Sequence, residues 1–174
     1  MQRSQLEHVI RASAGITGAK EFIIIGSQAV LGQFPNAPAE LLISIEADIY
    51  SLRNPQDADL IDGSIGEGSP FHQTFGYHAH GVAEETAILP LGWKDRLILI
   101  HNENTGGGTG LCPEVHDLAA SKLVAGREKD LDFVRALLHH RLAKPELIRN
   151  RLNSTPIPPE RQELCQARLN RCSQ

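Results

Sequence analysis

Glu46 and Asp48 stand two positions apart within the apolar segment LLISIEADIY, residues 41–50. The alternation of side chains along a strand places both carboxylates on one face, with Cα atoms about 6.5–7 Å apart. Two carboxylates at this spacing can converge on one divalent cation. With a further oxygen ligand they can hold the metal ions that phosphoryl and nucleotidyl transfer require. A solvated strand face explains the same spacing, so both interpretations stay open.

Gly26 and Ser27 directly follow the apolar run FIII, residues 22–25, which is typical of a strand buried on both faces. A glycine–serine turn between such a strand and a short helix, with Ser27 as its cap, offers backbone N–H groups and a hydroxyl to a phosphate. The turn and a metal held by the two carboxylates would together bind a nucleoside triphosphate.

The two features together resemble the signature of the nucleotidyltransferase superfamily of the DNA polymerase β type. In particular, the chain looks like small bacterial nucleotidyltransferase-like proteins, including the toxin components of abortive-infection (AbiEii-type) systems. A third block carries the likeness further: DLAASKL, residues 117–123, leads into REKDL, residues 127–131. In those toxins a helical Lys and a later Asp complete the nucleotide site, and the matching positions are Lys122 and Asp130.

The resemblance implies that Glu46 and Asp48 bind Mg²⁺ (or Mn²⁺), Gly26 and Ser27 seat the β- and γ-phosphates, and Lys122 steadies the triphosphate. Asp130 would orient Lys122 or act as the base, although the exposed side of an amphipathic helix explains Asp130 equally well. The implied reaction moves a nucleoside monophosphate from an NTP to a hydroxyl of RNA, protein or a small molecule. The alternative is a catalytically degraded relative that binds nucleotide or regulates a partner, for example in a toxin–antitoxin pair.

The sequence departs from the family pattern at the third carboxylate. Glu46 replaces a first Asp, and no clear acid follows on a later strand, where YHAHG, residues 77–81, carries histidines. If Glu84 or Glu85 faces Asp48 from a neighbouring strand, the enzyme interpretation gains; if only histidines or apolar residues do, the binding interpretation gains. His78 and His80 themselves could bind a transition metal, accept a proton opposite the carboxylates, or be an unremarkable surface pair, which we favour.

Periodicity and turn residues predict an α/β (α+β) fold, a small mixed sheet flanked by helices with a helical C-terminal segment. Residues 1–140 would form the nucleotidyltransferase-like domain, and residues 141–174 a basic helical extension packed on it. The expected helices cover 4–14 (opened by a Ser4–Glu7 capping box), a segment from 55, another from 69, 113–125, 128–140, 144–152 and 159–171. The expected strands cover 22–25, 41–50, 79–89 and 96–100, and residues 105–110 would be a loop.

Composition narrows the class of protein. With 174 residues, 41% hydrophobic and 22% charged, the chain has the size and composition of one globular domain, and its net charge of −4 is too small to suggest polyanion binding by bulk charge. No segment predicts a membrane span or a signal peptide, and three cysteines without a CxxC pair indicate reduced thiols, which together favour a cytoplasmic protein.

Residues 141–174 hold seven basic and three acidic residues. They would dock an RNA such as tRNA, or pair with the acidic body, which we favour; a cognate antitoxin is the other expected macromolecular partner besides the NTP.

Overall fold

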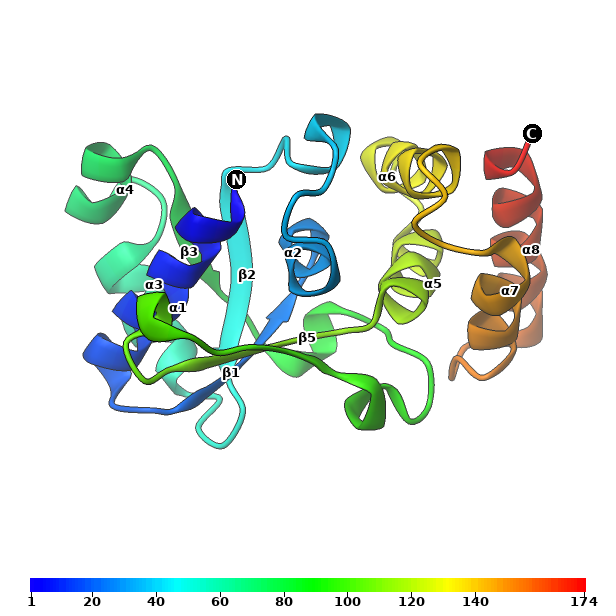
Figure 1. The fold of residues 1–174 in the computed structure, drawn as a ribbon. Coiled ribbons are helices and arrows are strands. Elements are labelled where there is room, and N and C mark those ends of the chain that lie inside the picture. Colours follow the sequence, from blue (N-terminus) through cyan, green and yellow to red (C-terminus); the bar gives the residue numbers. More distant parts are fainter.

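The computed structural model describes residues 1–174 and is built on a five-stranded mixed sheet with the strand order β3-β2-β1-β5-β4 (Figure 1). The strands are β1 (Glu21–Ile25), β2 (Glu46–Ser51), β3 (His78–Gly81), β4 (Ile98–Ile100) and β5 (Thr109–Cys112). β1 pairs antiparallel with β2 and parallel with β5, β2 pairs parallel with β3, and β4 pairs antiparallel with β5. The predicted fold class is therefore confirmed.

Eight α-helices accompany the sheet. They are α1 (Arg3–Thr17), α2 (Val30–Gln33), α3 (Asp57–Ile65), α4 (Pro70–Phe75), α5 (Val115–Ala125), α6 (Glu128–His139), α7 (Pro145–Asn153) and α8 (Pro159–Cys172). Figure 1 shows α1, α3 and α4 at one end of the sheet and α5 to α8 together at the other. None of these helices is long and apolar enough to span a membrane.

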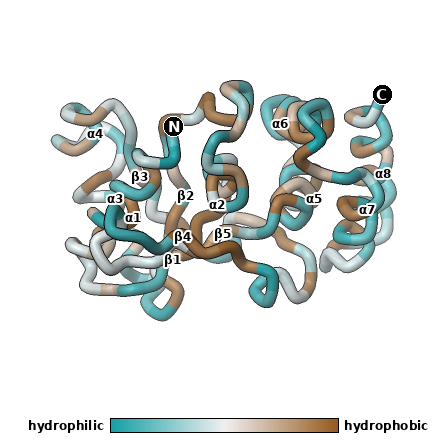
Figure 2. Tube along the Cα trace, viewed as in Figure 1, coloured by the Kyte–Doolittle hydropathy of each residue, from teal (hydrophilic) through white to brown (hydrophobic).

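The central strand β1 is buried on both faces, as its uninterrupted apolar run predicts. Phe22 and Ile24 enter the larger apolar cluster, whereas Ile23 and Ile25 enter a smaller one around Trp93 on the opposite face. Figure 2 shows this concentration of hydrophobic residues along the central strands. The end of β1 is thereby held from both sides, which fixes the position of the turn that follows it.

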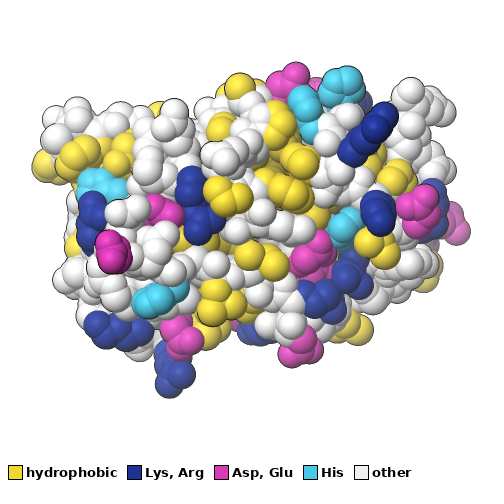
Figure 3. All heavy atoms as spheres, viewed as in Figure 1, with side chains coloured by type: hydrophobic (Ala, Val, Ile, Leu, Met, Phe, Trp, Pro, Cys, Tyr) yellow, Lys and Arg dark blue, Asp and Glu magenta, His cyan; other side chains and the backbone are white.

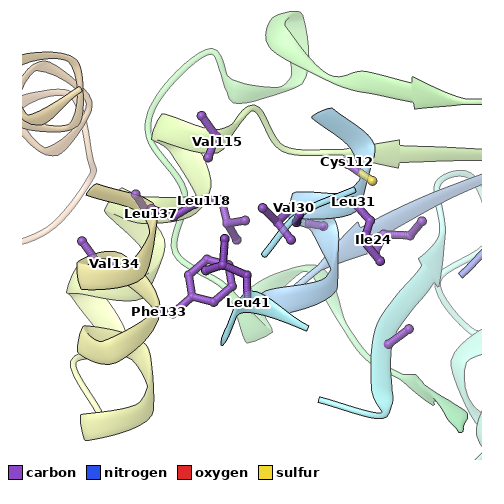
Figure 4. Close-up of a cluster of buried hydrophobic side chains, with 14 of the residues drawn as sticks. Ile24, Val30, Leu31, Leu41, Cys112, Val115, Leu118, Phe133, Val134 and Leu137 are labelled. Carbon is purple, nitrogen blue, oxygen red and sulfur yellow. The ribbon is translucent and has the colours of Figure 1, made fainter. Parts of the chain in front are cut away.

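The larger cluster also joins the sheet to the C-terminal helices. In Figure 4, Ile24 of β1 and Leu31 of α2 lie on one side of this cluster, while Leu118 of α5 and Phe133 of α6 approach from the other. The same cluster continues into α7 and α8 through buried Ile148, Leu152, Cys165, Leu169 and Cys172. All three cysteines are buried free thiols, as expected.

The sequence does not predict β5, because the glycine-rich segment 105–110 suggests a loop. Gly110 lies within β5, and a Cβ there would come within 2.7 Å of the side chains of Ile10 and Ile24. Glycine is thus needed for α1 to pack closely on the sheet, which is a tertiary requirement that local sequence patterns do not reveal.

Three of the expected strands are shorter than predicted. The strand expected over 96–100 begins only at Ile98, after the 3-10 turn Trp93–Arg96. The strand expected over 79–89 ends at Gly81, and the chain then leaves the sheet for a 3-10 turn, Glu84–Thr86. The strand expected over 41–50 begins only at Glu46, after a 3-10 turn, Ala39–Leu41. Ile43 has no sheet partner and is 81% exposed, so its apolar character does not reflect strand burial.

The expected helix caps also differ. The capping box of α1 is formed by Gln2 and Gln5, not by Ser4 and Glu7. Glu7 is instead buried, where it accepts hydrogen bonds from Arg3, Asn102 and Asn104. Gly26, not Ser27, takes the N-cap position of the 3-10 turn Ser27–Ala29.

Candidate functional site

The two acidic residues of β2 lie beside two histidines of β3. The parallel register pairs Glu46 with His78 and Asp48 with His80. His80 Nδ1 is 3.1 Å from Asp48 Oδ1 and 3.8 Å from Glu46 Oε1, and His78 Nε2 is 3.4 Å from Glu46 Oε2. The alternation along each strand therefore places the four side chains on one face, at one end of the sheet.

No third carboxylate faces Asp48 from a neighbouring strand. Glu84 and Glu85 lie on the 3-10 turn that follows β3, where Glu84 pairs with Lys94 and Glu85 lines the wall of the cleft. The position opposite Asp48 belongs to His80. Because a histidine and not an acid faces Asp48, the binding interpretation gains support at this one position.

The interpretation of the histidines as an unremarkable surface pair is wrong. His78 is 4% exposed, and its Nδ1 has no hydrogen-bond partner. His80 is half exposed but directed at both carboxylates. The alternating HAH pattern indicated that the two histidines share one strand face. The sequence did not reveal the register of β3 on β2, which places these side chains beside Glu46 and Asp48.

Gly26 leaves room for the Asp48 carboxylate at the end of β1. Its φ of +72° lies in the left-handed region, and a Cβ built on it would overlap with Asp48 Oδ2. Glycine alone meets both requirements, because any other residue would be strained and would displace the carboxylate. The glycine–serine turn and the acidic strand are therefore in direct contact.

Ser27 connects this turn to the helices. Lys122 Nζ, on α5, donates hydrogen bonds to Ser27 Oγ at 2.9 Å and to Asp130 Oδ1 at 3.0 Å. Asp130, at the start of α6, is fully buried and also accepts two hydrogen bonds from the Arg127 guanidinium at 2.6 and 3.2 Å. The exposed-face interpretation of Asp130 is therefore wrong, and sequence reasoning did not assign Arg127 a place in this network.

The pKa values of these groups follow from burial and from their neighbours. Burial raises the pKa of Asp48, and the nearby Glu46 charge raises it further, against the opposing effects of His80 and Lys122. Burial lowers the pKa of Lys122, although Asp130 opposes this shift. Burial would raise the pKa of Asp130, but hydrogen bonds and charges from Arg127 and Lys122 outweigh it and lower the pKa.

All six residues singled out from the sequence line one cleft of about 1290 Å³. They are Gly26, Ser27, Glu46, Asp48, Lys122 and Asp130. The sheet supplies an acidic wall and α5 and α6 a wall with basic residues, while Ile43, Ile88 and Phe133 add apolar surface. The volume exceeds the roughly 300–1,000 Å³ that is typical of small-molecule sites.

A divalent cation fits the donor set of the strand wall. Ligand atoms of Glu46, Asp48 and His80 all lie within 4.8 Å of one another. Carboxylate oxygens are suitable ligands for Mg²⁺ and Mn²⁺, and an imidazole nitrogen is a suitable ligand for transition metals. The absence of a Cβ on Gly26 allows Asp48 to occupy this position.

Charges elsewhere on the molecule are mixed. Figure 3 shows basic and acidic side chains interspersed over the face in view, with hydrophobic surface between them. Four of the seven basic residues after position 140 bind groups of this chain: Arg149 binds Gln166 and Asn170, Arg151 pairs with Asp117, and Arg161 and Arg168 bind carbonyls of α5. Intramolecular pairing thus accounts for much of the basic character of residues 141–174.

Residues 4–156 match the model of a family described as "Nucleotidyltransferase of unknown function (DUF6036)". The matched region includes both walls of the cleft. No curated protein and no solved structure matches the chain.

Proposed function

The chain belongs to this family of nucleotidyltransferases of unknown function, and on that premise we propose that it is a metal-dependent enzyme that transfers a nucleoside monophosphate from an NTP to a hydroxyl group. The observation that carries the proposal is the convergence of three separate sequence blocks on one cleft. Gly26 makes room for Asp48, and Ser27 contacts Lys122. A metal ligand, a phosphate-binding turn and a cation are thereby adjacent.

Each residue has a role that its surroundings support. Glu46 and Asp48 would hold Mg²⁺ or Mn²⁺, which supplies charge neutralisation at the phosphates when bound. The backbone at Gly26 and the hydroxyl of Ser27 would bind phosphate oxygens, and the Lys122 ammonium would neutralise the leaving pyrophosphate.

Asp130 is better suited to position Lys122 than to act as the base. It is fully buried, its two oxygens are occupied by Lys122 and Arg127, and these partners lower its pKa. A base must reach the hydroxyl from which it takes a proton. We therefore assign Asp130 the positioning role among the two that the family resemblance implies.

A second candidate function rests on the histidines. Because His80 occupies the place opposite Asp48 where a third acid is expected, a relative that binds nucleotide without transferring it, and regulates a partner, is the alternative. This alternative predicts nucleotide binding without a labelled product.

The test is transfer of label from NTPs carrying ³²P in the α-phosphate. The protein is incubated with each of the four NTPs, Mg²⁺ or Mn²⁺, and total RNA or cell lysate. We expect one acceptor to become labelled, and Asp48→Asn to reduce labelling about 10³-fold or more because a metal ligand is lost. Asp59→Asn, an exposed acid on α3 outside the cleft, serves as the matched control and should label normally.

The outcomes separate the two functions. Absence of label together with a rise in melting temperature on adding Mg²⁺ and an NTP would support the binding alternative, since a ligand of the folded state stabilises it. Absence of both label and stabilisation would contradict both.

We further propose RNA, including tRNA, as the acceptor, and a bacterial toxin–antitoxin setting of the AbiEii type in the cytoplasm. The family resemblance supports this setting, with a cognate antitoxin protein as partner, and the three free thiols agree with a reducing compartment. RNA would have to contact the exposed cations after position 140 that bind no other part of the chain, namely Arg141, Lys144 and Arg171. Changing Arg141 and Arg171 to Glu should weaken RNA retention in a salt-dependent manner, and unchanged retention would contradict RNA as the acceptor.

We treat residues 141–174 as an extension of the domain formed by residues 1–140. The support is packing: α7 and α8 contact α5, and their buried residues belong to the cluster that also contains β1. Deleting this extension would therefore expose apolar core, so charge reversal is the cleaner test of RNA binding.

A further inference from the structure

The residue opposite Asp48 on the neighbouring strand carries nitrogen, not oxygen. His80 reaches this position because β3 runs parallel to β2 in a register that pairs the two residues. Its Nδ1 faces the carboxylates of both Asp48 and Glu46. Three ligand atoms from two strands therefore lie within 4.8 Å of one another in the lining of the cleft.

The separations suit coordination of a single ion. Two ligands at right angles on an ion with bonds of about 2.1 Å lie about 3 Å apart. His80 Nδ1 and Asp48 Oδ1 are 3.1 Å apart, and His80 Nδ1 and Glu46 Oε1 are 3.8 Å apart. Small rotations of the half-exposed Glu46 and His80 side chains would bring all three atoms to one ion, with the remaining positions open to water or phosphate.

The surroundings favour such an ion beyond the donor atoms themselves. His78, which is 4% exposed, directs its Nε2 toward Glu46 Oε2 at 3.4 Å, so it can orient that carboxylate by a hydrogen bond. Gly26 lacks the Cβ that would displace Asp48. Residues of this kind, which orient ligands without touching the metal, support many protein metal sites.

We propose that Glu46, Asp48 and His80 form a mixed carboxylate–histidine metal site, and that the imidazole makes the site select Mn²⁺ over Mg²⁺. The inference rests on the proposed function, because it names the ion of the same site. Mg²⁺ is a hard ion that binds oxygen ligands and keeps its water, whereas Mn²⁺ binds carboxylates and also accepts imidazole. One nitrogen among the three protein ligands therefore shifts the preference toward the transition metal.

A histidine without metal would explain the same distances as a hydrogen bond to Asp48. In that case His80 would contribute nothing to cation affinity beyond what the two carboxylates give. Spectroscopy distinguishes the two arrangements, because only a coordinated imidazole couples its nitrogen strongly to a bound paramagnetic ion.

The experiment uses the whole chain and Mn²⁺ as the probe, without nucleotide. Free Mn²⁺ is measured by electron paramagnetic resonance during titration and during competition with Mg²⁺, and coupling to ¹⁴N is measured by electron spin-echo modulation. The variants are His80→Gln, His80→Asp, which replaces the nitrogen by oxygen, and His101→Gln, a control at an exposed histidine outside the cleft. Circular dichroism verifies that each variant is folded.

We expect ¹⁴N coupling in the unaltered protein and in His101→Gln, and its loss in His80→Gln and His80→Asp. His80→Gln should bind Mn²⁺ at least about 10-fold more weakly, and His80→Asp should reduce the preference for Mn²⁺ over Mg²⁺ by about 10-fold or more. Absence of ¹⁴N coupling in the unaltered protein, its persistence in His80→Gln, or an unchanged preference in His80→Asp would each overturn the inference.

Failure of this inference and failure of the proposed function give different results. Label transfer that proceeds with Mg²⁺ and is unchanged in His80→Asp would support the transferase and contradict the assignment of His80 as a metal ligand. Mn²⁺ coordination by His80 without any label transfer would support the metal site and contradict the transferase.

Discussion

The two walls of the cleft are built on opposite electrostatic principles. On the strand wall, Glu46 and Asp48 are two like charges whose neighbours are histidines, and burial with mutual repulsion raises the pKa of Asp48. On the helix wall, Lys122, Asp130 and Arg127 satisfy one another through hydrogen bonds of 2.6–3.2 Å. The strand wall thus carries neighbouring like charges that the proposed cation would neutralise, whereas the charges of the helix wall are paired with one another.

Because of this difference between the two walls, we expect substitutions in them to have different effects on the stability of the folded state. Removing Asp130 from the helix wall leaves the buried Lys122 ammonium without its partner charge, which is costly to the folded state. Removing an acid from the strand wall relieves repulsion in the absence of a cation. Single substitutions in the two walls should therefore change stability in opposite directions, with the largest change on the helix wall.

Asp130→Ala should give the largest loss of stability. The change leaves Lys122 buried beside Ser27 with no counter-charge in contact, and breaking a buried pair in this way costs about 3–5 kcal/mol. Urea unfolding followed by circular dichroism measures the difference. Asp132→Ala, an exposed acid two residues along the same helix, is the matched control and should cost less than about 1 kcal/mol. Equal losses in the two variants would contradict the distinction drawn for the helix wall.

Gly26→Ala should reduce both stability and metal binding. A residue with a Cβ at φ +72° and ψ −168° is strained by about 1–3 kcal/mol, and the methyl group would also displace Asp48. Gly18→Ala is the control, because Gly18 has φ +73° and a Cβ there would have no other atom within 4 Å. We expect backbone strain in both variants, larger in Gly26→Ala because Gly26 has ψ −168° whereas Gly18, at ψ −3°, lies in the αL well, and a loss of Mn²⁺ affinity in Gly26→Ala alone. Unchanged Mn²⁺ affinity would show that the close approach of Gly26 to Asp48 does not matter for the site.

Lys122→Met should cost less stability than Asp130→Ala, about 1 kcal/mol, although it breaks the same ion pair. Asp130 keeps the Arg127 guanidinium, and the buried ammonium, whose pKa burial lowers, is replaced by an apolar group of similar length. Nucleotide affinity should fall, because the cation next to Ser27 is lost. Thermal unfolding with and without an NTP and Mg²⁺ measures both effects; a stability loss as large as that of Asp130→Ala would contradict the assignment of Arg127 as the second partner.

Asp48→Asn should slightly stabilise the metal-free protein at pH 7.5. In the folded state the pKa of Asp48 is raised above its usual value of 3.8. In the pH range just above 3.8, the folded state therefore binds more protons than the unfolded state. Stability therefore falls as the pH rises through this window, and the penalty remains at neutral pH. Replacing the carboxylate by an amide removes the penalty, and we expect a melting temperature about 2 °C higher, a change of roughly half a kcal/mol for a chain of this size. The gain should vanish near pH 3.5, where Asp48 is protonated in the unaltered protein; a decrease in melting temperature at pH 7.5 would contradict the proposed repulsion.

Much of the fold could be predicted from local patterns. The run FIII at residues 22–25 indicated the central strand because an apolar, β-branched segment bounded by glycine is typical of one. Within residues 113–140, Gly126 indicated the boundary between two helices, and in the structure it ends α5 with a φ of +66°. The strand β5 could not be predicted in this way, because Gly110 is required by contacts with Ile10 and Ile24 that are distant in the sequence.

The candidate site was predictable to the same extent. The acidic pair and the glycine–serine turn were visible as separate motifs, and the structure brings them into contact. The identity of the residue facing Asp48 was not predictable, because it depends on the register of β3, which is set by how the long connection through α3 and α4 returns to the sheet. The extent of β3 was overestimated for a related reason: the apolar residues after Gly81 cover the other face of the sheet, as Val82 and Leu89 do, instead of extending the strand.

The last helix is attached to the end of the helix that carries Lys122. Arg168 donates a hydrogen bond to the carbonyl of Leu123 at 2.7 Å, and its guanidinium fills the space beside Gly126. In a chain truncated before α8, the Leu123 carbonyl would lose its hydrogen bond from Arg168, and the last turn of α5 would be less stable. Loss of the proposed transfer in such a truncated protein would therefore be explained by displacement of Lys122 without any loss of an RNA-binding surface. Shortened variants made to test transfer should retain α8.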